Sequence, residues 1–131
     1  MMPLEKTLAY VCNDSSMPQL TPDDYEILKR LPIPLDEAMK IAELHKAQRC
    51  SFLDNQIVID AFGEVQLCCA VYDSSKYAIS NYLNTPINHI HEIRRSHPMC
   101  AKCACVGGHV YVPASAPEFE IIADANLSEK E

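Results

Sequence analysis

The sequence lacks several features that define common classes of protein. It contains no apolar run of roughly 18 residues, so no segment is expected to span a membrane. No cluster of lysine and arginine offsets the formal net charge of −7, which argues against nucleic acid and anionic membranes as partners. The N-terminal segment has no long apolar stretch and does not resemble a signal peptide. We therefore expect a cytoplasmic protein.

Recognisable catalytic motifs are also missing. The chain has only three glycines, and the adjacent pair Gly107-Gly108 is too short to cradle a phosphate. Neither a serine-nucleophile motif nor a pair of carboxylates suited to acid–base chemistry can be recognised. We assign no catalytic residue.

Cysteine, by contrast, is abundant. The chain has 131 residues, enough for one domain, and 48% of them are hydrophobic, enough for a buried core. It contains seven cysteines, an odd number that fits a complete disulfide framework poorly. Because thiols stay reduced in the cytosol, seven of them favour metal or redox chemistry over disulfides.

The first third of the chain is predicted to form a strand and two helices. Residues 8–12 are apolar and β-rich, which favours a short strand. Thr21 is a predicted helix N-cap, Pro22 begins that helix, and Leu31 ends it before the next proline. A second helix is predicted over 36–48. Its apolar stripe, expected to face the core, comprises Leu35, Ala38, Met39 and Ala42.

A β-hairpin is predicted next. Ile57 and Ile59 alternate on the first strand, and Gly63 takes the turn position that needs a positive φ. The apolar face of the second strand is expected to carry Val65, Leu67 and Cys69.

The last third is predicted to hold one helix, a cysteine-rich loop and a tail. Thr85 and Pro86 have the pattern of a helix cap followed by a first-turn proline. A cysteine-rich loop is expected over 96–109, and the Pro/Ala-rich, acidic segment 113–131 is expected to be flexible.

The cysteines supply two pairs of candidate ligands. Cys100 and Cys103 form a CxxC, whose spacing suits a zinc knuckle, a redox pair or half of an iron–sulfur site. The redox pair is disfavoured because this CxxC is expected in a loop after a helix. Cys50 precedes the first hairpin strand and Cys68 ends the second, so the turn brings them together. The four thiolates would form a closed tetrathiolate site.

These cysteines carry a family resemblance. Cys50, twelve residues, Gly63, four residues and Cys68, followed by the segment 77–93 and then Cys100-x2-Cys103, resemble the auxiliary-cluster domain of radical SAM enzymes. That domain is called SPASM or, in its one-cluster form, twitch. The resemblance covers about residues 50–105. It implies a 4Fe–4S cluster held by Cys50, Cys68, Cys100 and Cys103, with an electron-transfer or structural role.

The sequence also departs from that family. Ser80 replaces the usual glycine of the linking segment, and only Cys105 follows the CxxC, which favours the one-cluster form. The chain contains no CxxxCxxC motif, so we do not expect it to cleave S-adenosylmethionine by itself. The implied partners are a radical SAM catalytic chain or a peptide or protein substrate. The alternative is a small zinc-binding interaction domain that uses the same four cysteines.

The expected fold class is therefore α+β. A small β-hairpin with flanking helices and a cysteine-rich loop would surround the cluster, after a strand–helix–helix segment that resembles the end of a radical SAM barrel. The domain boundaries follow as a lead-in over 1–49, a cluster-binding domain over 50–112 and a tail over 113–131.

The remaining candidates near the site receive lesser roles. Cys12 and Cys69 are predicted to be small buried core residues, and Cys105 is an additional candidate ligand. His97 and His109 lie close to the CxxC in sequence, but histidine ligation of such clusters is uncommon. For Lys102, inside the CxxC, the hypothesis is that its charge offsets the cluster's negative charge.

Overall fold

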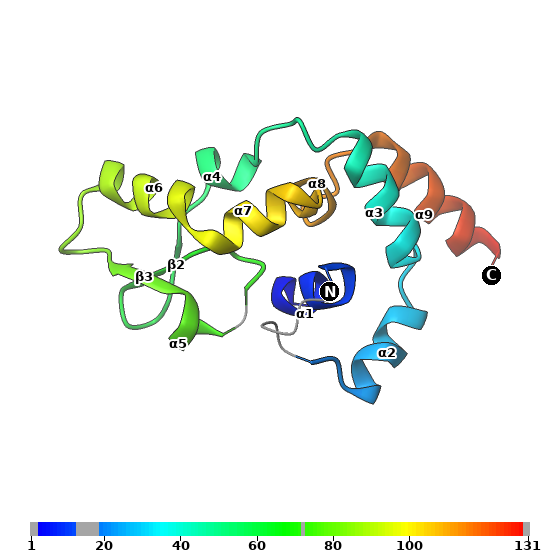
Figure 1. The fold of residues 1–131 in the computed structure, drawn as a ribbon, viewed down its shortest axis with the longest axis horizontal. Helices are drawn as coiled ribbons and strands as arrows, with labels where there is room; N and C mark the ends of the chain where they lie inside the picture. The colour runs from blue at the N-terminus through cyan, green and yellow to red at the C-terminus, as the bar shows by residue number, and fades with distance from the viewer. Residues whose placement is uncertain (1–2, 13–18, 72, 130–131) are drawn as a thin grey trace.

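The computed structural model describes residues 3–12, 19–71 and 73–129. This part of the chain combines several helices with one small antiparallel sheet, so the α+β class is confirmed. The sheet and helices α4, α5 and α6 lie at one end of the elongated molecule, and α2, α3 and α9 lie at the other (Figure 1). None of the described helices has the length and apolar character needed to cross a bilayer.

The described helices account for most of the architecture. They are α1 (Leu4–Cys12), α2 (Pro22–Lys29), α3 (Leu35–Leu44), α4 (Ser51–Asn55), α5 (Ser74–Tyr77), α6 (Ile87–Ser96), α7 (Pro98–Cys105), α8 (Gly108–Tyr111) and α9 (Pro117–Glu129).

The sheet contains the predicted hairpin and one further strand. Strands β1 (Val58–Ile59) and β2 (Glu64–Gln66) pair antiparallel, with Val58 opposite Gln66. Gly63 has a φ of 81°, as the turn requires, and this prediction is confirmed. Strand β3 (Ala78–Asn81), which the sequence analysis did not predict, pairs antiparallel with β2 and completes the order β1-β2-β3.

The predicted cap of α2 is confirmed. The Thr21 side chain accepts a hydrogen bond from the Asp24 backbone N–H, and the Asp24 carboxylate accepts one from the Thr21 backbone. Lys6 of α1 donates to Asp24 at 2.8 Å, which ties α1 to α2 and, with the Thr21 bonds, lowers the pKa of Asp24. The helix ends at Lys29, two residues before the predicted Leu31, since Arg30 already forms the C-cap.

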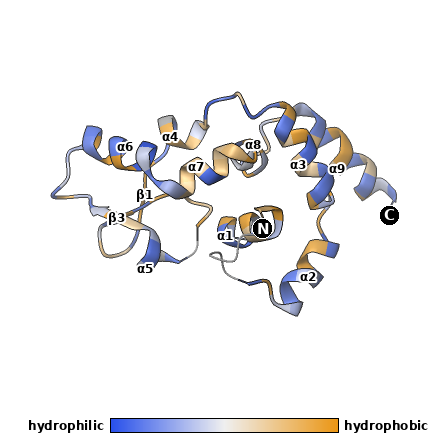
Figure 2. Cartoon of the chain, in the orientation of Figure 1, coloured by the Kyte–Doolittle hydropathy of each residue, from blue (hydrophilic) through white to orange (hydrophobic). Residues whose placement is uncertain are grey.

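One hydrophobic core, termed the helical core, joins α3, α8 and α9. The whole predicted stripe of α3 is buried in it. Figure 2 shows hydrophobic residues on both α3 and α9, which lie side by side. The helical core comprises Leu35, Ala38, Met39, Ala42, Val110, Ala116 and Phe119.

A second core, termed the cysteine-side core, lies between α1, the end of β2 and α7. It comprises Leu4, Leu8, Leu67, Ala70, Val71, Tyr77 and Met99. Because Leu4 and Leu8 are one helical turn apart, both point into this core from α1. The prediction of a strand over 8–12 is therefore wrong, and the expected strand–helix–helix lead-in is a run of helices.

Three further expectations differ from the structure. The cysteine-rich segment is not a loop, because α7 occupies most of it. Thr85 does not cap α6, whose N-cap is Pro86. The expected flexible tail over 113–131 contains α9, and Phe119 anchors this helix in the helical core.

Candidate metal centre

Helix α7 positions the CxxC. Pro98 occupies its first turn, and His97 caps it by accepting a hydrogen bond from the Met99 backbone N–H at 3.1 Å. Cys100 and Cys103 are three residues apart, so both thiols lie on the same face of the helix. This arrangement replaces the predicted loop with a rigid element.

The other two candidate ligands come from separate segments. Cys50 is the N-cap residue of α4, with an extended backbone, and Cys68 follows the end of β2 by two residues. The sequence predicted that Cys50 would approach Cys68 from the start of the hairpin. Because α4 lies between Cys50 and β1, Cys50 instead lies at the start of α4, and Cys68 lies just after the end of β2.

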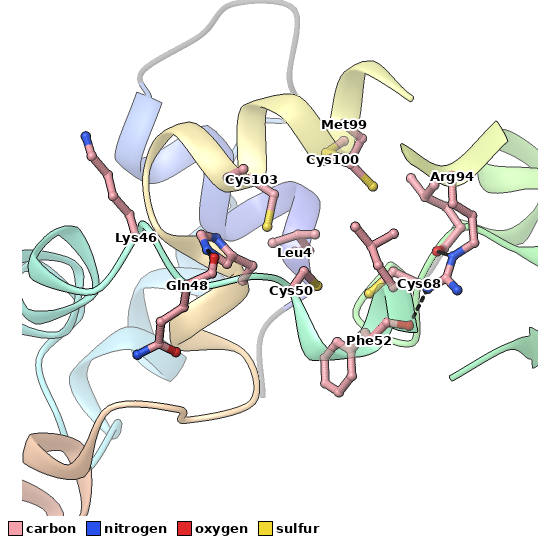
Figure 3. Close-up of a pocket in the computed structure, with 14 residues that line it drawn as sticks. Leu4, Lys46, Gln48, Cys50, Phe52, Cys68, Arg94, Met99, Cys100 and Cys103 are labelled. Carbon is pink, nitrogen blue, oxygen red and sulfur yellow. Dashed lines mark hydrogen bonds between the residues drawn. The ribbon is translucent and has the colours of Figure 1, made fainter. Parts of the chain in front are cut away.

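All four cysteines line one cavity, termed the cysteine cavity (Figure 3). Its volume is about 160 Å³. A cavity of about 150 Å³ in another protein core holds a benzene ring, so this one exceeds the needs of a single ion. Among the described residues, the cavity also has Leu4, Lys46, Gln48, Phe52, Leu53, Leu67, Arg94, Met99, Ala104 and His109 in its wall.

The thiols surround this volume and do not converge on one point. Within the described residues, no three histidine, cysteine, aspartate or glutamate side chains are arranged to hold a single metal ion. The sulfurs nevertheless influence one another electrostatically, since ionised Cys50, Cys68 and Cys100 each disfavour ionisation of Cys103. The donor set is therefore spread around a shared cavity.

Burial raises the pKa of Cys68, Cys100 and Cys103 and so favours their protonated forms. Burial, followed by the charges of Cys50, Cys68 and Cys100, raises the pKa of Cys103 to about 12. Burial, with smaller contributions from Cys69 and Cys50, raises the pKa of Cys68 to about 11. The pKa of Cys100 is also raised, mainly by burial. A metal that binds here has to displace these protons.

The Gly-Gly pair allows two close approaches. A Cβ on Gly108 would lie 2.7 Å from the Cys103 Sγ, so only glycine leaves room for that sulfur. Gly107 has a φ of 79°, and a Cβ there would lie 2.8 Å from the Ala42 carbonyl oxygen. One glycine thus serves the cysteine cavity, and the other serves the contact with α3.

Two features suit an anionic iron–sulfur group in this cavity. The Ala70 backbone N–H donates to the Cys68 Sγ at 3.4 Å, and such bonds to ligand sulfurs tune iron–sulfur centres. Arg94 is buried in the wall, and among the described lining residues there is no carboxylate to balance it. Cys50, Cys68, Cys100 and Cys103 would hold the group, which would supply one-electron redox chemistry.

Sequence analysis missed Arg94. Its spacing could have indicated it. Arg94 follows Ile87 by seven residues and Ile90 by four, so the three residues share one face of α6. A charged residue on an apolar stripe is unusual and needs a partner.

The two histidines have different positions. His109 lines the cavity, and its Nε2–H donates to the Gln48 carbonyl at 2.7 Å. Its buried Nδ1 has no hydrogen-bond partner in the part of the chain that the structure describes. His97 is the cap of α7, and burial lowers its pKa.

Cys12, Cys69 and Cys105 are all exposed. The predictions of a buried Cys12 and a buried Cys69 are therefore wrong. Strand β2 ends at Gln66, so the alternation expected to bury Cys69 stops before reaching it. Cys105 follows Cys103 by two residues on α7 and is absent from the described lining of the cavity, as is Lys102.

Comparison with known proteins adds no identification. No family model, curated protein or solved structure matches this chain. The functional argument therefore depends on the site.

The raised thiol pKa values bear on whether the CxxC could act as a redox pair. The CxxC lies near the start of a helix, as in thiol redox proteins, so the loop argument against a redox pair is not valid. A reactive dithiol nonetheless requires a lowered thiol pKa, whereas the pKa values of Cys100 and Cys103 are both raised. The arrangement suits ligation better than thiol exchange.

Proposed function

We propose that this chain is a 4Fe–4S cluster-binding domain whose ligands are Cys50, Cys68, Cys100 and Cys103. It has an electron-transfer or structural role like that of the auxiliary-cluster region of radical SAM enzymes. It does not cleave S-adenosylmethionine by itself. It acts in the cytoplasm with a radical SAM catalytic chain or on a peptide or protein substrate.

One observation carries the proposal: four thiols from three separate segments line one cavity. Thiolates are the usual ligands of iron–sulfur clusters, and full cysteine ligation leaves no iron open to substrate. The room that Gly108 leaves beside the Cys103 sulfur gives further support.

The size of the cavity supports a cluster as the first candidate and zinc as the alternative. Zinc binds thiolates at about 2.3 Å, so four sulfurs around one tetrahedral ion lie roughly 3.8 Å apart. No such single-ion group exists among the described residues, and the thiols instead surround a volume of about 160 Å³.

The test is the metal content of the chain after anaerobic purification and reconstitution. We expect iron and sulfide near four each per chain and a broad brown absorption. Colourless protein with one zinc would exclude a cluster.

Matched variants identify the ligands. Alanine at Cys50, Cys68, Cys100 or Cys103 is expected to abolish cluster retention. Alanine at the exposed Cys12, Cys69 or Cys105 should leave iron and sulfide unchanged. Retention in Cys68→Ala combined with loss in Cys69→Ala would show that the ligand is misassigned by one residue.

A further inference from the structure

Arg94 is among the most deeply buried residues of the molecule. Its side chain extends from α6 into the wall of the cysteine cavity, and the residue is only 1% exposed. An arginine side chain carries a positive charge in proteins. The chain therefore places a permanent positive charge beside the four thiols.

The guanidinium is held by backbone carbonyls of two segments. Its Nε donates to Leu67 O at 3.1 Å, and its terminal nitrogens donate to Gln56 O at 2.6 Å and Phe52 O at 2.9 Å. Figure 3 shows the bond to Phe52. Phe52 lies two residues after Cys50, and Leu67 immediately precedes Cys68. Arg94 thus fastens the segments that carry two of the cysteines.

These acceptors are all neutral. Among the described residues, no carboxylate forms an ion pair with Arg94, and the cavity wall contains no aspartate or glutamate. The other lysine or arginine in that wall is Lys46, which is half exposed and paired with Glu43 at 2.6 Å. A buried charge without a counter-ion is costly, so the cavity favours an anionic occupant.

We propose that Arg94 is the counter-charge of the cluster and raises its reduction potential. The inference rests on the proposed function and makes it more specific. A low-potential one-electron donor adds one electron, and no proton, to the four-thiolate cluster unit, which becomes more negative by one charge. The nearby fixed positive charge stabilises this reduced form more than the oxidised form. Arg94 thereby favours an electron-transfer role over a purely structural one.

The test compares Arg94→Met and Arg94→Gln, which remove the charge, with Arg94→Lys, which keeps it. Lys46→Met is the matched control, because it removes a solvent-screened cation from the same wall. Each protein is reconstituted anaerobically, its iron and sulfide are measured, and the cluster is titrated with dithionite and redox dyes while absorbance is followed.

The comparison is made at a solution potential equal to the wild-type midpoint. There, the ratio of reduced to oxidised cluster is expected to fall about tenfold or more in the neutral variants, equivalent to about 59 mV for one electron. It should stay within roughly threefold in Arg94→Lys and be unchanged in Lys46→Met.

Several outcomes would overturn the inference. One is a fully loaded neutral variant with an unchanged ratio, and another is a ratio that falls equally in Arg94→Lys. If the neutral variants take up no cluster, cluster uptake by Arg94→Lys supports the counter-charge role. No uptake by any of the three variants would overturn it and leave Arg94 only its hydrogen bonds to the backbone carbonyls. Wild-type protein that takes up zinc and no iron or sulfide would overturn the proposed function and this inference together.

Discussion

The helical core and the cysteine-side core differ in what completes them. Leu35, Met39 and Phe119 are buried in the helical core, which consists of apolar side chains. The cysteine-side core borders a cavity whose wall holds thiols and a buried arginine. The helical core thus has only apolar packing, whereas the other core lies beside a cavity that a ligand could fill. Under the proposed function, one small chain would separate stability from chemistry.

Metal removal gives the sharpest separation of the two regions. Metal-binding energy is also folding energy, about 10–16 kcal/mol for structural zinc in small peptides, so we expect a loss of several kcal/mol. Hydrogen exchange should show lost protection over 64–71 and 98–105 on chelation, with 35–44 and 117–129 nearly unchanged. Equal loss in all four segments would mean that the two cores unfold as one.

Phe119→Ala attacks the helical core instead. Phe119 is 4% exposed, and its ring packs edge to face on Tyr111 with the ring centroids 6.3 Å apart. We therefore expect the free energy of unfolding to fall by about 3–5 kcal/mol. Chemical denaturation measures it, and metal stoichiometry should not change. Ile121→Ala, at a 70% exposed position of the same helix, is the control and should cost below about 0.5 kcal/mol. A Phe119→Ala protein that folds but loses its metal would contradict the independence of the two cores.

The adjacent glycines allow both regions to be tested at one point in the chain. Gly108→Ala places a Cβ against the Cys103 sulfur, so we expect reduced metal retention with a modest loss of stability. Gly107→Ala adds strain at positive φ and a clash with the Ala42 backbone, and should cost more than about 1 kcal/mol. The metal content of the reconstituted variants and the unfolding midpoint of the metal-free variants should rank them in opposite orders. Identical ranking would refute the division of roles.

The pH dependence of the metal-free protein tests the buried thiols of the cysteine cavity. The pKa values of Cys68 and Cys103 are raised to about 11 and about 12, so above the ordinary thiol value the unfolded chain ionises first. Stability should therefore fall as pH rises from about 9 to 11, by at most about 1.4 kcal/mol per pH unit for each thiol. Denaturation at several pH values measures this slope. Cys103→Ala should flatten it, and Cys105→Ala, at an exposed site, should not.

The helical core was the more predictable region. The α3 stripe could be predicted because its apolar spacing is local, and it is buried as expected. The Thr21 cap and the Gly63 turn were also predictable, since each depends on the conformation of a few neighbouring residues.

Features set by distant contacts could not be predicted. Residues 8–12 have β-rich composition, yet the chain is helical there because Leu4 and Leu8 pack into the cysteine-side core. The cysteine-rich segment differs, because its helix has local indicators in the sequence: His97 is the N-cap of α7 and Pro98 lies in its first turn. Cys69 was misplaced because the strand ends earlier than its apolar pattern suggests.

The candidate ligands could be chosen from spacing because a hairpin and a CxxC place cysteines in a predictable way. The cavity between them could not be predicted, because three separate segments and the Arg94 side chain form it. The spacing of Arg94 on α6 indicates an unusual charged residue, but the carbonyls that hold it are known only from the structure.

The position of His97 between α6 and α7 has a further consequence. This single residue is both the C-cap of α6 and the N-cap of α7, so nothing between the two helices can lengthen or rearrange as a loop would. Arg94 and Cys100 lie on opposite sides of this junction, six residues apart. Their spacing is therefore set across one extended residue, and the charge of Arg94 opposes the burial that raises the pKa of Cys100.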